Sequence, residues 1–433
     1  MDRHFIKWQF RADPAGNMKQ KRFFILAVFF ITAIHLLFIG FVRSQASHPD
    51  IRIYQWAGQL VLAGVNPYDF DDQKPVREAV KNGSSGPANF IQRMDQWDYY
   101  VSSNLPMSEI LYAAIEYASG GSRTVWRIFL ILGDILIFFG LVALVRSTGG
   151  NIEDPATQIG IACLSIFNPL LLKDGGFTPE DKQFQTALLL FGAALLLSRS
   201  SSTRHYIKTG LVLSVGIFFK MFGIFLAPLW LQRAVPGRAR FLMWTLAAGL
   251  VPAILSFALF GDRFIPLMFH RARDNSIGAA AHASPWVLIP DLAGHPFLIA
   301  KLVISAACAA LLAALLFKKR IDTLNFCAGA AVIFGCIWLD AGSLDRMNIA
   351  IIFAIAALMS LKPEWFSALA VLNLIAGAVT VVFSILVYEK EEIVEAVYVL
   401  FFLIAYFATL AHPGPKLGLE MASGWISEKL VRR

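Results

Sequence analysis

Charged residues are scarce in this sequence. Asp, Glu, Lys and Arg make up only 16% of its 433 residues, whereas 57% are hydrophobic and the mean hydropathy is +0.60. No single soluble core could bury so much apolar surface. A helix needs about 20 apolar residues to cross roughly 30 Å of hydrocarbon, and the chain holds many such runs, so we predict an all-α polytopic membrane protein.

Cysteines are few and isolated. None lies in a CxxC pair or near a pair of histidines, which argues against a disulfide framework and against a zinc site. We therefore expect neither a metal nor another cofactor. The four cysteines, all inside apolar runs, are Cys163, Cys308, Cys327 and Cys336.

Acidic residues are outnumbered, 30 against 38 Lys and Arg, which gives a net charge of +8. The basic residues lie mainly in short loops between apolar runs, where the positive-inside rule and anionic head groups account for them. The charge thus indicates membrane lipids as partners and gives no reason to expect nucleic acid.

Ten apolar runs are candidates for full membrane crossings. Lys19, Lys21 and Arg22 precede the first run and place the N-terminus in the cytoplasm. No small-residue cleavage site follows this run, so we expect it to stay as an anchor. The runs are residues 23–42, 125–145, 159–172, 184–197, 241–260, 297–317, 324–339, 347–361, 366–387 and 397–411.

One domain accounts for nearly the whole chain, because no soluble domain and no repeat of fixed period is evident. We expect a cytoplasmic segment 1–22, a transmembrane domain 23–411 with a large external loop 43–123, and a cytoplasmic tail 412–433. The protein should lie in the cytoplasmic (inner) membrane, with both termini inside.

The apolar stretch 206–231 lies between two basic loops, 198–208 and 232–240, that should both be cytoplasmic. One crossing cannot satisfy both. We therefore predict a re-entrant hairpin of two short helices, broken near Lys220 and Gly223, which brings the total to about 12 segments. A single tilted span with a snorkelling Lys220 is the alternative.

The stretch 50–72 follows the first span and has three parts: an acid, a short amphipathic helix and an Asn-Pro turn. Asp50 begins it, and Gln55 and Gln59 share one face of the helix. Such a helix should lie on the membrane surface, and Gly64 suits the left-handed position that ends it. We expect a second external helix over residues 106–117.

Polar residues gather on the external side of the predicted topology. Asp50 follows the first span, further acids occupy loop 173–182, and basic residues lie in the later external loops. A carboxylate there can deprotonate an acceptor hydroxyl, while cations stabilise a departing phosphate. The pattern suits group transfer at the outer membrane surface.

Two phrases stand out around the first external segments. An acid just after the first span is followed by Tyr54-x-x-Ala57 and by AGVNPYD, residues 63–69. The second phrase, GGFTPEDKQ at residues 175–183, precedes a Leu- and Ala-rich span. Together with the basic residues described next, these phrases form a pattern that covers most of the chain.

Two further phrases each centre on a basic residue, GIFFKMFGIFLAPLW on Lys220 and LDRMNIAII on Arg346. With these four phrases the chain resembles the GT-C superfamily of integral-membrane glycosyltransferases, in the branch that uses polyprenyl-phosphate mannose. Asp181 matches an acid of the family. Pro179-Glu180 stands where the family usually has a glutamine, so the resemblance does not fix the exact role of Asp181.

The resemblance implies a GT-C-like fold and an inverting glycosyltransferase. It would move a sugar, with mannose as the first expectation, from a polyprenyl-phosphate donor to a lipid or glycan hydroxyl on the outer face. The family's acid after the first span, here Asp50, is implied to be the general base. The implied phosphate contacts are Lys220, Arg346, Arg271 and Arg273, and the implied acceptor or sugar contacts are Asp181, Glu180, His282, Tyr54 and Tyr68.

Several alternatives stay open. Asp50 could cap the surface helix, Asp181 could be only an acid at a helix N-terminus, and Arg346 could pair with Asp345. A transporter or flippase of lipid-linked or sugar substrates would use the break at Lys220 as its transport site. An O-antigen ligase or polymerase is a third possibility. Polar groups on one face favour an enzyme over a transporter.

Overall fold

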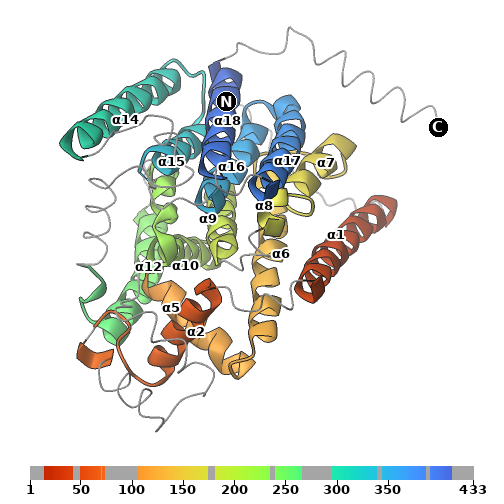
Figure 1. The fold of residues 1–433 in the computed structure, drawn as a ribbon. Coiled ribbons are helices and arrows are strands. Elements are labelled where there is room, and N and C mark those ends of the chain that lie inside the picture. Colours follow the sequence, from red (N-terminus) through yellow and green to blue (C-terminus); the bar gives the residue numbers. More distant parts are fainter. Residues whose placement is uncertain are drawn as a thin grey trace.

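The computed structural model describes residues 14–41, 49–69, 71–73, 105–173, 181–234, 239–265, 294–338, 344–386 and 391–411. The regular structure in these ranges is entirely helical (Figure 1). Seven of the described helices are long and apolar enough to cross a membrane, and three more are apolar but shorter. This confirms the class of an all-α, multi-pass membrane protein, while the exact number of crossings stays a prediction.

Each of the ten predicted runs overlaps one of these ten helical segments. The helices are α1 (Pro14–Phe41), α2 (Pro49–Leu62), α5 (Pro106–Ser119), α6 (Arg123–Ser147), α7 (Pro155–Leu164), α8 (Pro169–Leu172), α9 (Lys182–Leu197), α10 (Thr203–Lys220), η3 (Phe222–Leu226), α11 (Ala227–Ala234), α12 (Ala239–Phe260), α14 (Gly294–Phe317), α15 (Thr323–Trp338), α16 (Leu344–Ala357), η5 (Leu358–Ser360), α17 (Pro363–Leu386) and α18 (Glu391–Ala411).

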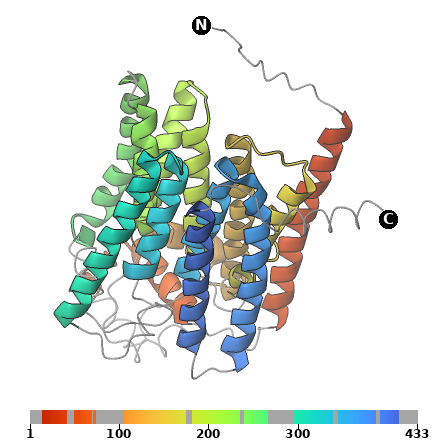
Figure 2. The same cartoon turned by 90° about the horizontal axis from the view of Figure 1, so that it is seen from above.

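Two helices flank the bundle and the rest pack between them. α1 and α14 stand on opposite sides of the bundle in both views (Figures 1 and 2), and both carry a row of exposed apolar side chains, as expected for surfaces that face lipid. α16 is buried along most of its described length. α2 and α5 lie together beside the start of α6, and this α2/α5 end of the bundle carries the candidate site.

α1 is held to α6 by aromatic contacts and one ion pair. Phe24 packs edge-on against Phe138 at 5.9 Å between ring centroids, and further along α1 His35 Nε2 lies 2.8 Å from Asp134 Oδ2. Because His35 follows Phe24 while Asp134 precedes Phe138, the two helices run antiparallel. His35 Nδ1 also lies 2.7 Å from the Ile31 carbonyl, so both ring nitrogens face oxygen atoms.

The break predicted near Lys220 and Gly223 is confirmed. α10 ends there, Met221 adopts a left-handed conformation (φ 65°), and the chain continues as the 3-10 helix η3 and then α11. η3 folds back onto α10 so closely that a Cβ on Gly223 would lie 2.8 Å from the Ile217 amide nitrogen. Glycine is therefore required at this turn.

Contacts at the end of α11 show that the chain returns to the end of the bundle where α10 begins. Arg233 of α11 donates to the carbonyls of Leu196, in the last turn of α9, and of Ser198, which directly follows that helix. Ser214 of α10 donates to Gly249 of α12 at 2.6 Å, and Arg240 donates to Thr203, so α10 and α12 run parallel. Residues 203–234 therefore do not form one continuous helix.

We predict that the hairpin depends on Gly223. Gly223→Ala places a methyl group against backbone atoms of α10, including the Gly216 carbonyl carbon at 3.0 Å, and should lower the free energy of unfolding by about 1–3 kcal/mol. Gly216→Ala is the matched control, because its Cβ would meet neighbours at 3.7 Å or more, which is ordinary contact. Thermal unfolding in detergent distinguishes them, and equal stability of the two variants would contradict the packing described.

Candidate functional site

The centre of the candidate site is an ion pair at the break of the hairpin. Lys220, the last residue of α10, places its Nζ 2.7 Å from Oδ1 of Asp181, which directly precedes α9. The Asp181 side chain is completely buried, whereas the Lys220 side chain is 18% exposed. A ligand can therefore reach the lysine but not the carboxylate behind it.

Asp181 does not cap α9, although it occupies the capping position. Its side chain makes no hydrogen bond to the free amides of the helix. Instead the Tyr112 hydroxyl donates to Asp181 Oδ2 at 2.6 Å, so the two carboxylate oxygens contact Tyr112 and Lys220. The sequence left open whether this acid serves the helix terminus or a site, and the structure shows that its side chain does not cap α9.

The break also satisfies a backbone group that a helix end normally leaves unpaired. Ser108, in the first turn of α5, donates from its hydroxyl to the Phe219 carbonyl at 2.9 Å. Since Phe219 directly precedes Lys220, α5 holds the end of α10 in place. The lysine is thus fixed from both sides, by α5 and by Asp181.

Tyr112 connects the ion pair with α2. Its ring stacks on Tyr54 at 4.5 Å between centroids with an interplanar angle of 22°, and Tyr54 in turn lies 6.5 Å from Trp126 of α6. All three rings are buried. Such stacked pairs contribute about 0.5–1.5 kcal/mol beyond the burial of their area, so α2 is held firmly against α5 and α6.

Glu116 is a second buried acid that joins these three helices. Its carboxylate accepts from Trp126 Nε1 at 2.6 Å and from Gln59 Nε2 at 2.7 Å, and Gln55 Nε2 lies 3.5 Å from it. Gln55 and Gln59 therefore share one face of α2, as the sequence indicated. That face is covered by α5, which the expectation of a surface helix did not include.

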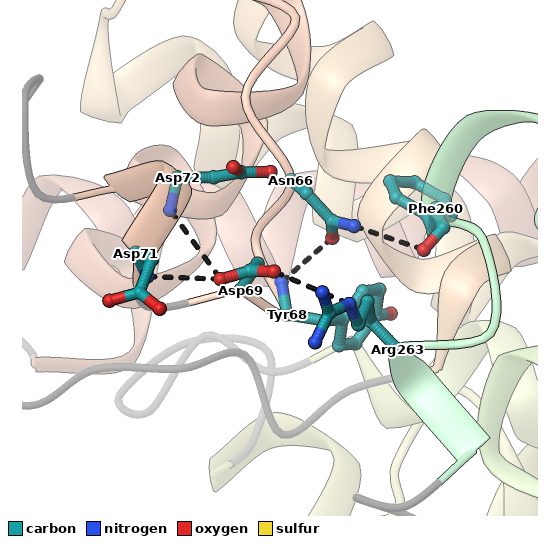
Figure 3. Close-up of polar contacts among 7 residues, drawn as sticks. All are labelled: Asn66, Tyr68, Asp69, Asp71, Asp72, Phe260 and Arg263. Atoms are coloured by element: carbon teal, nitrogen blue, oxygen red, sulfur yellow. Dashed lines mark hydrogen bonds and ion pairs between the residues drawn. The ribbon is translucent and has the colours of Figure 1, made fainter.

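The Asn-Pro-Tyr-Asp turn after α2 binds to the end of α12 (Figure 3). Asn66 donates to the Phe260 carbonyl at 3.0 Å and accepts from the Tyr68 amide, while the Asp69 carboxylate lies 3.4 Å from Arg263. The Tyr68 ring packs edge-on against Phe260 at 5.4 Å. The turn thereby ties α2 to α12, and α2 ends at a left-handed Gly64 (φ 72°) as predicted.

Two glutamines line the interior next to the ion pair. Gln183 and Gln185 are buried in the first turn of α9, and neither amide group makes a hydrogen bond with a described residue. Gln185 lies close to Gly216, one helical turn before Lys220. Because buried amides are normally paired, bound water or a ligand is expected here.

The sequence-predicted residues fall into three groups. Asp181 and Lys220 are brought together, while Tyr54 and Tyr68 are buried in aromatic contacts and serve packing in this structure. Asp50 stands in the first turn of α2, which begins at Pro49, so it does not occupy the capping position; its side chain lies outside the described part. The side chain of Arg346 in α16 and all of Glu180, Arg271, Arg273 and His282 also lie outside it.

Sequence reasoning missed Tyr112, Glu116 and Arg127. Tyr112 and Glu116 are four residues apart on α5, and a tyrosine above an acid on one face of an otherwise apolar helix was a usable signal. Within the described ranges, no group of three or more His, Cys, Asp or Glu could hold a metal ion. Neither models of known protein families nor a search of curated proteins gives a match to the chain.

We predict that Lys220 stabilises the fold through Asp181. Lys220→Met leaves a buried carboxylate without its cation, and because the lysine is partly exposed the loss should be roughly 1–3 kcal/mol, less than for a fully buried pair. Adding Asp181→Asn should restore part of the loss, since no uncompensated charge remains. Lys208→Met, an exposed lysine on the same helix, is the control. Additive effects of the two substitutions in thermal unfolding would contradict the pairing.

Proposed function

We propose that the chain is an inverting glycosyltransferase that uses a polyprenyl-phosphate sugar and works at the outer face of the cytoplasmic membrane. The observation that carries the proposal is the Asp181–Lys220 pair at the break of a helix, on the same end of the bundle as the start of α2. In this proposal ten helices cross the membrane, the hairpin re-enters it, and both termini lie inside.

Lys220 is the proposed contact of the donor phosphate. Its ammonium is held in place by Asp181, whose other carboxylate oxygen accepts from Tyr112, yet the lysine side chain remains accessible to a ligand. A fixed cation next to a leaving phosphate stabilises the negative charge that develops as the glycosidic bond breaks. Arg346, Arg271 and Arg273 are further candidates for the same phosphate.

Asp50 is the proposed general base. It accepts the proton of the acceptor hydroxyl as that oxygen attacks the anomeric carbon from the side opposite to the phosphate. The bond between this carbon and the phosphate oxygen breaks, and the polyprenyl phosphate leaves with the electron pair. The rigid contacts of Tyr54, Gln55 and Gln59 fix α2 and so fix the position of its first turn.

The test is sugar transfer by the purified protein from labelled polyprenyl-phosphate mannose to a panel of membrane lipid and glycan acceptors. Asp50→Asn should lower the rate by about 100-fold or more, the usual contribution of a general base, while donor binding is kept. Asp72→Asn is the control, since Asp72 is an exposed acid of the same external segment. Transfer at the unchanged rate by Asp50→Asn would sink the assignment of the base.

A transporter of lipid-linked sugars is the second candidate, because broken helices with a charge at the break also occur in transporters. The same protein in sealed vesicles distinguishes the two. Movement of labelled donor across the bilayer without formation of a glycosylated product would favour transport, whereas product formed on one side without net movement favours the transferase.

A further inference from the structure

Arg127 is a buried cation that the proposed transfer does not use. It is the fifth residue of α6 and is only 3% exposed. Its Nη2 is completely buried, and the guanidinium makes no hydrogen bond or ion pair with any residue of the described ranges. An arginine this deeply buried normally has a counter-charge.

Three acids on the surrounding helices are already engaged. Asp134 of α6 pairs with His35, Glu116 of α5 accepts from Trp126 and Gln59, and Asp181 contacts Lys220 and Tyr112. None of these three contacts Arg127. The arginine therefore requires an anion other than these three carboxylates.

Helical geometry gives the direction in which Arg127 points. Asp134 follows seven residues later, which is two turns along the same face of α6, and its partner His35 lies on α1. Phe138, one turn further, packs against Phe23 of α1 at 5.6 Å between centroids. Arg127 thus lies on the face of α6 that meets α1, at the α2/α5 end of the bundle.

The depth and surroundings of Arg127 suit a lipid head group. Four residues separate it from the start of α6 at Arg123, a rise of about 6 Å, so it lies near the membrane interface if α6 crosses the bilayer. On α1, Leu36 and Leu37 are exposed, at 46% and 67%, so lipid chains can lie along the outer face of this helix. Arginine binds phosphate oxygens through two parallel hydrogen bonds.

We propose that Arg127 binds the phosphate of an anionic lipid head group between α1 and α6, at the α2/α5 end. The phosphate can come from a glycerophospholipid or from a polyprenyl phosphate, which share this chemistry. The site is separate from the Lys220 centre, and it holds whether or not the chain transfers sugars.

The test measures thermal unfolding of the purified full chain in a neutral detergent, titrated with phosphatidylglycerol, with undecaprenyl phosphate or with zwitterionic phosphatidylcholine. An anionic lipid should raise the unfolding temperature of the wild type, and whichever of the two acts identifies the source of the phosphate. Arg127→Met should weaken the apparent affinity about tenfold or more. Arg146→Met is the control, an arginine of the same helix at the opposite end, whose guanidinium lies 5.7 Å from the Phe24 ring.

A second measurement separates a ligand site from a structural arginine. Without lipid, Arg127→Met should be at least as stable as the wild type, because it removes a buried charge that has no partner among the described residues. Arg127→Lys keeps the charge but not the paired hydrogen bonds and should bind with intermediate affinity. A wild-type lipid response in Arg127→Met, or a strong loss of its stability without lipid, would overturn the proposal.

Discussion

The ion pair between Asp181 and Lys220 is the interaction on which the site end of this protein depends. It can form only because α10 stops at Lys220 and the chain turns back, and because Tyr112 presents its hydroxyl to the other oxygen of Asp181. Tyr112 then extends the network by stacking on Tyr54. One buried carboxylate thereby sets the relative positions of α2, α5, α9 and α10, and removing any of its contacts leaves a costly buried charge.

The helical class and the break near Lys220 followed from general constraints, and so they could be predicted. Apolar runs must be helical in a membrane, and two basic loops cannot lie on one side with a single crossing between them. The predicted cytoplasmic position of both loops therefore favoured a hairpin over residues 206–231. Gly223 then identified its turn, where the structure brings backbone against backbone. The sequence did not reveal that α7 and α8 are separate helices, because only Ser165 and Asn168 interrupt an otherwise continuous apolar run.

The site could be predicted only in part. Lys220 was recognisable because a charge is expensive within an apolar run, but the choice of Asp181 as its partner depends on the tertiary fold. Tyr112, Glu116 and Arg127 were missed because each looks like an ordinary residue in its own segment, and only the packing of α5 and α6 reveals its burial. Conversely Tyr54 and Tyr68 were expected to touch a sugar, whereas here they pack against other rings. Aromatic side chains serve both purposes, and sequence alone does not separate them.

The central claim is that Lys220, held by Asp181, binds the phosphate of a lipid-linked sugar at the break of the hairpin. An experimental structure of the purified protein with a non-hydrolysable polyprenyl-phosphate sugar tests this most directly. The account predicts a phosphate oxygen within hydrogen-bond distance of Lys220 Nζ, the Asp181–Lys220 pair intact, and the sugar directed towards the first turn of α2. A ligand phosphate bound away from Lys220, with the sugar distant from α2, would contradict it.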